Sequence, residues 1–468
     1  MYSARKKMSK IFNVLEKYKE KTGLIDNNNN RFSYNKILKK AETITGQVKK
    51  RSLILFISSN ILESIVGYIA FVKNDNIIIL LDKNFEKKFV KKMIKSYRPS
   101  FVYKPKDYFL KNLKSKRLYN GKEYELIRTN FKLKNDYNKK NFLLLTTSGS
   151  TQNPKLVRLS ENNILNNLKN IKKYLNIDSN NTTITTMPMA YSYGLSIINT
   201  FIYSGAKIVL SEKNIFEKEF WEKIKNYKVN SISGVPEFFE FLKKLKIDKI
   251  KINKLKYFTH AGGKLNKDTI KYFVNHAKKN KHKFYSMYGQ TEASPRMSYL
   301  ECTKNLSKIG SIGKPLQGSK FFLVDEKNKI INKNFKIGEI VYKGKNVCLG
   351  YANNIKDLYK GDLNKGKLFT GDIGYKDNHG FFFLTGRKNR ISKIFGLRFN
   401  LDDIENKLKK NNFYARLVPS NKYLKILIIN NYNIDKIKNL IYNSYKINKS
   451  FIFINKVKKF PNKILFNK

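Results

Sequence analysis

The sequence is poor in the residues that build disulfide frameworks and zinc sites. Its 468 residues include only two cysteines, Cys302 and Cys348, and four histidines. Two cysteines cannot make a disulfide framework, and they fit a reducing compartment. The histidines, at positions 260, 276, 282 and 379, lack the spacing of zinc ligands. The composition therefore excludes a disulfide-rich secreted module and disfavours a structural zinc site.

Acidic residues are scarce as well. Asp and Glu together number 35 against 95 Lys and Arg, a formal charge of +60, and only 12 of the 95 are arginine. Nucleic-acid or membrane-surface binding is one interpretation. The other is biased composition, because Lys, Asn and Ile all have A/T-rich codons. The lysines run through every region instead of forming one stripe, and base-reading proteins favour Arg. We therefore expect no specific nucleic-acid partner, and a salt titration of nucleic-acid binding would distinguish the two interpretations.

Long apolar runs are missing. The run Ile77–Leu81 is far shorter than the about 20 residues of a spanning helix, and polar residues interrupt Gly194–Leu210. The basic residues at the N-terminus are followed by no apolar signal-peptide core. The sequence thus predicts no membrane span and a cytoplasmic location. Apolar residues still make up 41% and aromatic residues 13% of the chain, which is enough for real cores.

Short apolar runs alternate with helical stretches over most of the chain. Ser52–Ile57 and Ile77–Leu81 are typical of buried parallel strands, with a helix expected over 61–71. The same alternation continues to about residue 290 and favours doubly wound α/β layers. Short strands after about residue 310 predict a small β-barrel or sandwich, with the barrel expected over about 311–386. The last part, 387–468, predicts a small α+β domain with helices over 401–410 and 434–445.

The strongest local signal runs from Leu143 to Lys155. An apolar run leads directly into small polar residues, Thr147-Ser148-Gly149-Ser150-Thr151, and then Pro154-Lys155. Gly149 lets the backbone approach an anion, the neighbouring amides and hydroxyls donate to phosphate oxygens, and Lys155 adds a positive charge. The segment is not a Walker A loop, because Pro154 precedes the lysine and Leu156 follows it. The alternative is an ordinary polar hairpin.

This loop resembles the phosphate-loop signature of the acyl-adenylate-forming superfamily, which includes acyl-CoA synthetases, luciferases and peptide-synthetase adenylation domains. Gln152 is the one departure, since Gly is usual there. Tyr288-Gly289-Gln290-Thr291-Glu292 is similar to a second family motif. The resemblance implies that Tyr288 stacks on adenine, that Thr291 contacts phosphate and that Glu292 holds Mg²⁺, for which a carboxylate is a suitable hard ligand. Gly262 and Gly263 resemble the segment on the other side of the adenine.

Further family motifs follow in order. In Thr370-Gly371-Asp372 the resemblance assigns Asp372 to the ribose hydroxyls, and Arg387 to ribose or phosphate. It places a hinge near Asn389, and Lys393 and Gly396 in a loop that approaches the acceptor thiol. Lys463 is assigned to charge stabilisation during adenylation, although Lys456, Lys458 and Lys459 lie close by. Gly338-Glu339 and Gly350-Tyr351 match the intervening pattern and are interpreted as structural turns.

The fold implied is α/β: a large N-terminal domain over 1–386, made of two doubly wound α/β subdomains and the small barrel, followed by a mobile lid over 387–468. The implied reaction is activation of a carboxylic acid with Mg-ATP to an acyl-adenylate. The acyl group then passes to the thiol of CoA or, alternatively, to the phosphopantetheine of an acyl carrier protein. A catalytically degenerate binding module is a lower-ranked alternative.

The acid is expected to bind beside Met187–Gly194, against Tyr191, Ser192 and Tyr193, because the family's acyl pocket lies there. Residues 187–199 contain no Asp or Glu. A buried ammonium without a counter-ion is costly, so a fatty or other organic acid is favoured over an amino acid. The three side chains also suit a hydroxylated acid, and the segment faintly resembles ligases of surface-polysaccharide acylation.

Overall fold

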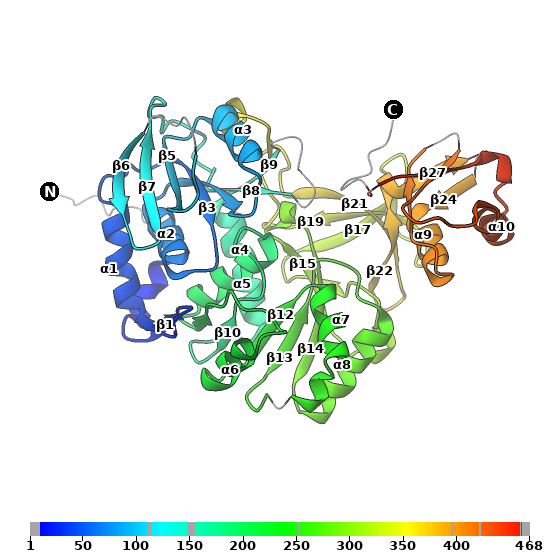
Figure 1. Cartoon of the computed structure of the whole chain (residues 1–468), viewed down its shortest axis with the longest axis horizontal. Coiled ribbons are helices and arrows are strands. Elements are labelled where there is room, and N and C mark those ends of the chain that lie inside the picture. The colour runs from blue at the N-terminus through cyan, green and yellow to red at the C-terminus, as the bar shows by residue number, and fades with distance from the viewer. Residues whose placement is uncertain are drawn as a thin grey trace. The chain divides into compact units, whose positions relative to one another are not determined.

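The computed structural model describes residues 10–110, 115–147, 155–250, 252–394, 397–420, 423–458 and 460 (Figure 1). The chain divides into two compact units. Unit 1 comprises Met1–Lys320 and Tyr342–Leu368, and unit 2 comprises Phe321–Val341 and Phe369–Lys468. Within the described ranges, none of the helices has the length and apolar character needed to cross a membrane.

The first sheet of unit 1 has eight strands in the order β20-β9-β8-β4-β3-β5-β7-β6. Its four central strands run parallel, and the outer ones are antiparallel to their neighbours. The strands are β3 Leu53–Ser58, β4 Ile77–Asp82, β5 Phe101–Pro105, β6 Ser115–Asn120, β7 Tyr124–Thr129, β8 Leu143–Thr146, β9 Leu156–Leu159 and β20 Gly350–Ala352. Helices α2 Leu62–Lys73 and α3 Lys87–Tyr97 connect its parallel strands.

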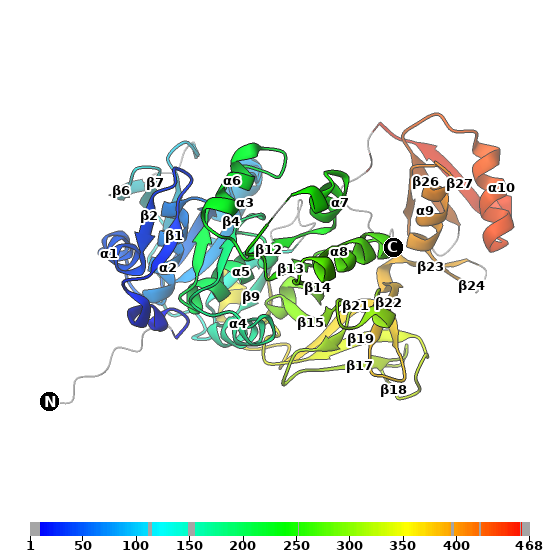
Figure 2. The ribbon, with the colours of Figure 1, turned by 90° about the horizontal axis from the view of Figure 1, so that it is seen from below.

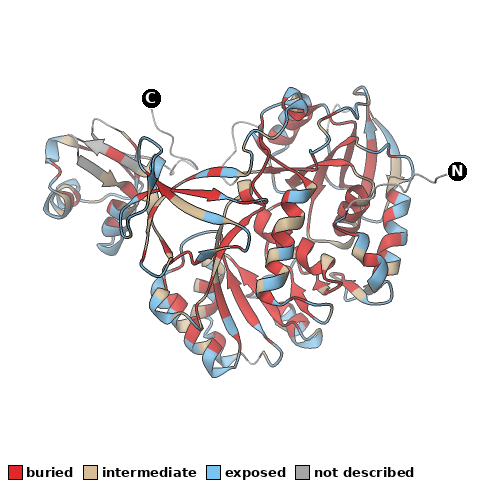
Figure 3. Ribbon diagram, turned by 180° about the vertical axis from the view of Figure 1, so that it is seen from behind, coloured by how far each residue is buried: buried red, intermediate tan, exposed pale blue. Residues whose placement is uncertain are grey.

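The unbroken apolar sequence of β3 follows from burial on both faces. Ile54 and Phe56 pack into one hydrophobic cluster, whereas Leu53, Leu55 and Ile57 pack into another on the opposite side. Successive side chains of a strand point to opposite faces, so a strand covered on both sides needs every residue to be apolar. Figure 3 shows these central strands as buried. The predicted strands and the helix between them are confirmed.

The second sheet of unit 1 has nine strands in the order β16-β15-β14-β13-β12-β10-β11-β1-β2. They are β1 Thr22–Ile25, β2 Arg31–Ser33, β10 Thr182–Ile184, β11 Lys207–Val209, β12 Ser231–Gly234, β13 Tyr257–His260, β14 Lys283–Gly289, β15 Arg296–Glu301 and β16 Lys314–Pro315. The strands from β14 to β11, together with β1, run parallel. The helices are α1 Tyr34–Thr45, α4 Glu161–Leu175, α5 Ser192–Tyr203, α6 Lys218–Asn226, α7 Pro236–Lys244 and α8 Lys267–Lys279, the last two lying beside β12–β14 in Figure 2.

A single hydrophobic cluster joins the two sheets of unit 1. It contains residues of α4 and α5 together with Phe56 of the first sheet and Tyr257 and Tyr285 of the second. The helices between the sheets are therefore apolar on more than one side, which explains the long apolar stretch over 194–210 without a membrane span. This arrangement confirms the two doubly wound layers.

The expected barrel over 311–386 is an open sheet. Its strand order is β18-β17-β19-β21-β22, and within the described residues β18 and β22 form its two edges. Closing a barrel requires the edge strands to pair, and β18 is only two residues long. Strands β16 and β20, which the expected range included, instead join the two large sheets. The five strands are β17 Lys320–Val324, β18 Ile330–Ile331, β19 Gly338–Lys343, β21 Lys367–Lys376 and β22 Phe382–Arg387.

The rest of unit 2 is a small α+β fold. Strand β26 pairs antiparallel with β25 and parallel with β27, and a separate hairpin joins β23 and β24. Its core is aliphatic and contains Leu401, Ile404, Ile426 and Ile437. The elements are β23 Ile391–Ile394, β24 Leu397–Asn400, α9 Leu401–Lys410, β25 Ala415–Val418, β26 Leu424–Ile428, α10 Ile434–Tyr445 and β27 Ile452–Lys456. The sequence predicted both helices with these bounds.

Seven short 3₁₀ helices complete the elements of the described residues. They are η1 Asn13–Tyr18, η2 Ile247–Lys249, η3 Thr291–Ala293, η4 Leu306–Lys308, η5 Ile355–Tyr359, η6 Lys388–Arg390 and η7 Lys449–Phe451.

Candidate functional site

The predicted phosphate loop connects two antiparallel strands. It leaves β8, a central strand of the first sheet, and returns on β9, with Thr146 opposite Leu156. Ser148, Gly149, Ser150 and Thr151 lie outside the described residues, and so does Gln152. Thr147 and Lys155 are described, and Lys155 is exposed. The two ends of the loop therefore lie at the carboxyl end of a buried strand, where ligands of doubly wound sheets bind.

The second motif forms a tight turn between β14 and β15. The Gln290 amide donates to the Pro295 carbonyl at 2.9 Å. A Cβ at Gly289 would lie 2.0 Å from that same carbonyl oxygen, so the turn requires glycine there. Tyr288 and Gly289 end the strand, and Thr291 and Glu292 begin η3 directly after it. The motif thus projects its hydroxyl and its carboxylate from a constrained backbone.

Two buried amides hold this turn from behind, and the sequence did not reveal them. Asn167 of α4 donates to the Arg296 carbonyl at 2.8 Å. Asn346 donates to the same carbonyl at 2.8 Å and to the Ala293 carbonyl at 2.6 Å. The Cys348 amide also donates to the Glu292 carbonyl at 2.8 Å. Buried carbonyls must be satisfied, so these bonds fix the position of the Glu292 backbone. A polar residue on the apolar face of a helix was the available signal for Asn167.

Glu292, Tyr351 and Lys155 meet at one place. The Tyr351 hydroxyl donates to Glu292 Oε1 at 2.8 Å, and Lys155 Nζ lies 3.5 Å from the centroid of the Tyr351 ring. Burial and the neighbouring Glu292 carboxylate raise the pKa of Tyr351, which keeps its hydroxyl protonated. The described residues contain no cluster of three or more His, Cys, Asp or Glu arranged for a metal. A single carboxylate fits Mg²⁺, which is often held by one or two carboxylates and substrate phosphates.

The two glycines predicted at the adenine follow β13, the parallel neighbour of β14. Gly262 has φ of +89°, and a Cβ there would lie 2.5 Å from the Tyr191 hydroxyl oxygen. A Cβ at Gly263 would meet Pro236 Cγ at 2.9 Å. His260 of β13 lies opposite Ser286 of β14 in the parallel strand pair. Gly262 and Tyr288 therefore extend from the same end of adjacent strands. The structure therefore brings together the two segments predicted to flank adenine.

The residues predicted to contact the acid lie around the start of α5. The Ser192 hydroxyl lies 3.1 Å from the Thr291 hydroxyl. Tyr193 is buried, and its hydroxyl bonds to Thr259 at 2.9 Å while the Arg296 guanidinium lies 4.1 Å from its ring centroid. Tyr191 is only partly buried. Burial raises the pKa of both tyrosines, and the Arg296 charge opposes that shift.

Asp372 and Arg387 face each other across β21 and β22 in unit 2. Arg387 Nε lies 2.9 Å from Asp372 Oδ1, and the carboxylate is buried whereas the guanidinium is exposed. A hollow of about 350 Å³ borders Thr370, Gly371 and Arg387. Asn389 lies in η6, and the backbone of Lys393 pairs with Arg398 in the β23–β24 hairpin. Gly396 and Lys463 lie outside the described residues.

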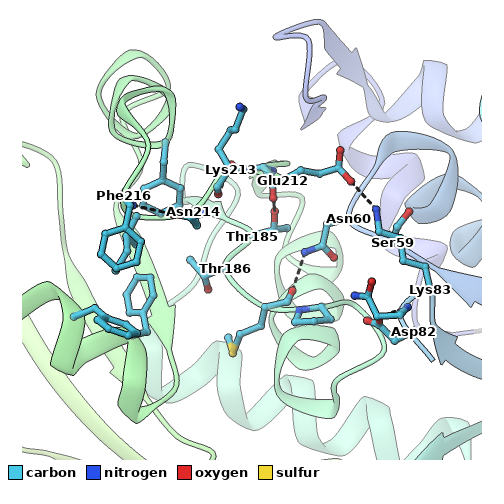
Figure 4. Close-up of a pocket in the computed structure, with 18 residues that line it drawn as sticks. Ser59, Asn60, Asp82, Lys83, Thr185, Thr186, Glu212, Lys213, Asn214 and Phe216 are labelled. Atoms are coloured by element: carbon cyan, nitrogen blue, oxygen red, sulfur yellow. Dashed lines mark hydrogen bonds and ion pairs between the residues drawn. The ribbon is translucent and has the colours of Figure 1, made fainter. Parts of the chain in front are cut away.

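A cavity of about 580 Å³ that the sequence did not predict opens in unit 1 (Figure 4). One wall is polar and follows the ends of β3 and β4, and it includes Asn60, which donates to the Met187 carbonyl at 2.9 Å. Lys83 pairs with Glu212 at 3.0 Å, and Lys213 pairs with Glu217 at 3.0 Å. The facing wall is aromatic and contains Phe216, Phe220, Phe238 and Phe241. The cavity thus combines an apolar wall with ionised side chains of both signs.

Polar turns at the carboxyl ends of parallel strands, in doubly wound sheets, define a nucleotide-binding class of α/β protein. The family model described as AMP-binding enzyme matches residues 11–352. This match covers more than half of the chain, and the chain belongs to the AMP-binding enzyme family.

Curated relatives share part of the chain. An oxalate–CoA ligase of Saccharomyces cerevisiae is 30% identical over 251 residues, which cover 52% of this chain and 44% of the relative. A 2-succinylbenzoate–CoA ligase of Bacillus cereus is 30% identical over 250 residues, covering 53% of this chain and 50% of the relative. The chain therefore spans about half the length of these curated relatives.

Solved structures match nearly the whole chain. The o-succinylbenzoate CoA synthetase of Bacillus subtilis, in complex with an acyl-adenylate intermediate, has a TM-score of 0.77 at 17% identity and covers 98% of this chain and 97% of that one. ATP-bound MatB of Rhodopseudomonas palustris has a TM-score of 0.75 at 16% identity, and the match covers 97% of this chain and 96% of that one. At these identities the likeness confirms the fold.

Proposed function

We propose that this chain is an ATP-dependent acid–CoA ligase that works through an acyl-adenylate. The observation that carries the proposal is the meeting of Lys155 and Glu292 at Tyr351, because it places a phosphate-seeking cation beside a metal-seeking carboxylate. Family membership and the names of the curated ligases support the same reaction class.

The first half-reaction joins the acid to the nucleotide. A carboxylate oxygen of the acid attacks the α-phosphorus of ATP, the bond from that phosphorus to the bridging oxygen breaks, and pyrophosphate leaves. The loop around Thr147 and Lys155 binds the outer phosphates, Thr291 donates to phosphate, and Lys463 stabilises the charge that develops. Glu292 holds Mg²⁺, which neutralises phosphate charge when bound.

The second half-reaction transfers the acyl group. The CoA thiolate attacks the acyl carbon, AMP leaves, and the thiol proton passes to solvent. Asp372 accepts from the ribose hydroxyls and Arg387 contacts ribose or phosphate, while Lys393 and Gly396 border the thiol after rotation of a C-terminal domain about Asn389. The domain boundary at 386/387 and this rotation are parts of the proposal.

We propose an organic acid without an ammonium group as the substrate. No Asp or Glu lies within residues 187–199, and the buried Arg296 guanidinium lies 4.1 Å from the centroid of the Tyr193 ring. An α-ammonium held beside Tyr193 would meet this like charge. The curated relatives are named for oxalate and 2-succinylbenzoate, so these acids belong in the test beside fatty and hydroxylated acids.

We assign the acceptor to the cavity of Figure 4. CoA carries phosphates and an adenine ring, and the cavity offers the ion-paired Lys83 and Lys213 beside the edge-to-face pair of Phe216 and Phe241. Met187 and Pro188 line this cavity and directly precede the predicted acid-binding residues. A thiol that enters this cavity therefore meets residues that adjoin the predicted acid-binding residues in the chain.

The test is pyrophosphate release from Mg-ATP with a panel of oxalate, succinylbenzoate, hydroxylated, fatty and amino acids, with and without CoA. We expect release with one class of organic acid, a rise with CoA, and loss in Glu292→Gln but not in the exposed control Glu86→Gln. Release that CoA does not change favours a carrier protein as acceptor. Absence of release with every acid, from protein that binds ATP, contradicts the ligase and favours a binding module.

A further inference from the structure

We propose that Tyr351 is a positioning residue that keeps Lys155 and Glu292 apart and available, the first for phosphate and the second for a divalent cation. The inference rests on the proposed function. Tyr351 belongs to a pattern that the sequence suggested only as a turn. The structure instead places its ring under the Lys155 ammonium and its hydroxyl on the Glu292 carboxylate.

The ring separates two opposite charges that would otherwise pair. In the described part of the chain neither Lys155 nor Glu292 forms an ion pair, although both side chains reach the same tyrosine. Direct pairing of an ammonium with a carboxylate would neutralise both groups before substrate arrives. The face of a neutral ring holds a cation more weakly than a carboxylate does. Lys155 therefore remains free to exchange the ring for a phosphate.

The Tyr351 hydroxyl gives the two carboxylate oxygens of Glu292 different roles. It donates to Oε1 at 2.8 Å, which leaves Oε2 for a hard cation. The Tyr351 side chain thus orients Lys155 with its ring and Glu292 with its hydroxyl.

The backbone around Tyr351 is anchored to the same carboxylate residue. Tyr351 lies opposite Val157 in the β9–β20 pair, two residues from Lys155. Three residues before Tyr351, the Cys348 amide donates to the Glu292 carbonyl at 2.8 Å. Leu349 exchanges hydrogen bonds with Arg158, which is fully buried. Tyr351 and Glu292 are therefore fixed to each other through main chain and side chain.

Two substitutions separate the two contacts. Tyr351→Phe keeps the ring under Lys155 and removes the bond to Glu292, whereas Tyr351→Leu removes both. Tyr359→Phe is the matched control, because Tyr359 is 40% exposed and bonds only weakly to Asp136, at 3.4 Å. Calorimetric titration of the full chain with ATP over a series of Mg²⁺ concentrations, without any acid, measures binding independently of turnover. Pyrophosphate release with a substrate acid then gives the KM for ATP and kcat.

We expect Tyr351→Phe to raise the Mg²⁺ concentration for half-maximal ATP binding about tenfold, with the affinity at saturating Mg²⁺ nearly unchanged. Tyr351→Leu should add a loss of about tenfold in ATP affinity that saturating Mg²⁺ does not restore. A purely structural residue would lower the Tm and the active fraction without moving the Mg²⁺ midpoint. If both Tyr351 variants keep the wild-type Mg²⁺ midpoint and the wild-type KM for ATP, the inference is overturned.

The inference and the proposed function fail separately. An active wild-type enzyme whose Tyr351 variants show unchanged Mg²⁺ midpoints contradicts the positioning role alone. A wild-type chain that binds Mg-ATP, with shifted midpoints in the variants and no turnover of any acid, contradicts the ligase alone. A wild-type chain that does not bind ATP overturns both.

Discussion

The hydroxyl oxygens of Ser192 and Thr291 lie 3.1 Å apart, although the two residues are 99 positions apart in the chain. Ser192 begins α5 and is one of the residues predicted to contact the acid, and Thr291 lies three residues after the tyrosine predicted at adenine. Folding therefore brings the acid-binding and phosphate-binding segments into direct contact. A carboxylate held at the first segment starts close to a nucleotide held at the second, which is the arrangement that adenylation requires.

Replacing Thr291 by Val should separate catalysis from folding. Valine keeps the shape of the side chain but removes the hydroxyl that bonds to Ser192 and is proposed to contact phosphate. We expect kcat for pyrophosphate release to fall at least tenfold, with a stability cost of about 1 kcal/mol for the lost bond. Ser192→Ala loses the same bond but no phosphate contact, so it should cost similar stability and less kcat. Equal kcat losses in both variants would contradict the assignment of Thr291.

Gly262→Ala should destabilise unit 1 and weaken nucleotide binding. The new Cβ would lie 2.5 Å from the Tyr191 hydroxyl, and φ of +89° is unfavourable for a side chain. A loss of about 1–3 kcal/mol in the free energy of unfolding is expected, measured by urea titration. Adding Tyr191→Phe should recover part of it, because it removes the clash and leaves the backbone strain. Gly361→Ala is the control, since a Cβ there meets nothing within 4 Å.

Asp372→Asn should weaken ATP binding more than it weakens the fold. Arg387, its partner at 2.9 Å, is 60% exposed, so solvent weakens this ion pair although the Asp372 carboxylate is buried. We expect the Kd for ATP to rise about tenfold if the carboxylate accepts hydrogen bonds from the ribose hydroxyls. The neutral amide carbonyl of Asn accepts a hydrogen bond less strongly than a carboxylate does. Calorimetry measures this, with the exposed Asp435→Asn of α10 as the control. An unchanged Kd would remove Asp372 from the nucleotide site.

Phe241→Ala tests the cavity of unit 1. Phe241 is 41% exposed and meets Phe216 edge-to-face at 5.3 Å, so its loss should cost little stability. If the aromatic wall binds CoA, the KM for CoA should rise about tenfold, by loss of a stacking contact of 1–2 kcal/mol, while pyrophosphate release without CoA stays unchanged. Phe335→Ala, at a position 59% exposed in unit 2, should change neither. A wild-type KM in Phe241→Ala would place CoA elsewhere.

Buried histidines predict a loss of stability in mild acid. Burial lowers the pKa of His282 to about 4, and its usual value is 6.5. The unfolded chain then binds more protons than the folded chain between these values, so stability is present above pH 6.5 and decreases as the pH falls toward 4. For His282 the loss from pH 7 to pH 5 is up to about 2 kcal/mol. His282→Phe should lose correspondingly less in urea titrations at the two pH values, and equal losses would contradict the shift.

Local patterns in the sequence were sufficient to predict several elements of the fold. The continuous apolar runs of β3 and β4 indicated strands covered on both faces, and the helical stretches predicted over 401–410 and 434–445 are α9 and α10. The motif spacing also placed Tyr288–Glu292 at the end of a strand, because a glycine after an apolar run marks a tight turn. These features depend on residues that are close together in the chain.

Contacts between segments that are distant in the sequence could be seen only in the folded chain. β1 joins the second sheet beside β11, about 180 positions away, and the strands after residue 310 form an open sheet, with β16 and β20 paired elsewhere. Asn167 and Asn346 converge on the carbonyls behind Glu292, and Tyr351 lies between Lys155 and Glu292. Hydrophobic periodicity records whether a residue is buried but not against which partner, and polar pairing at long range leaves no local pattern.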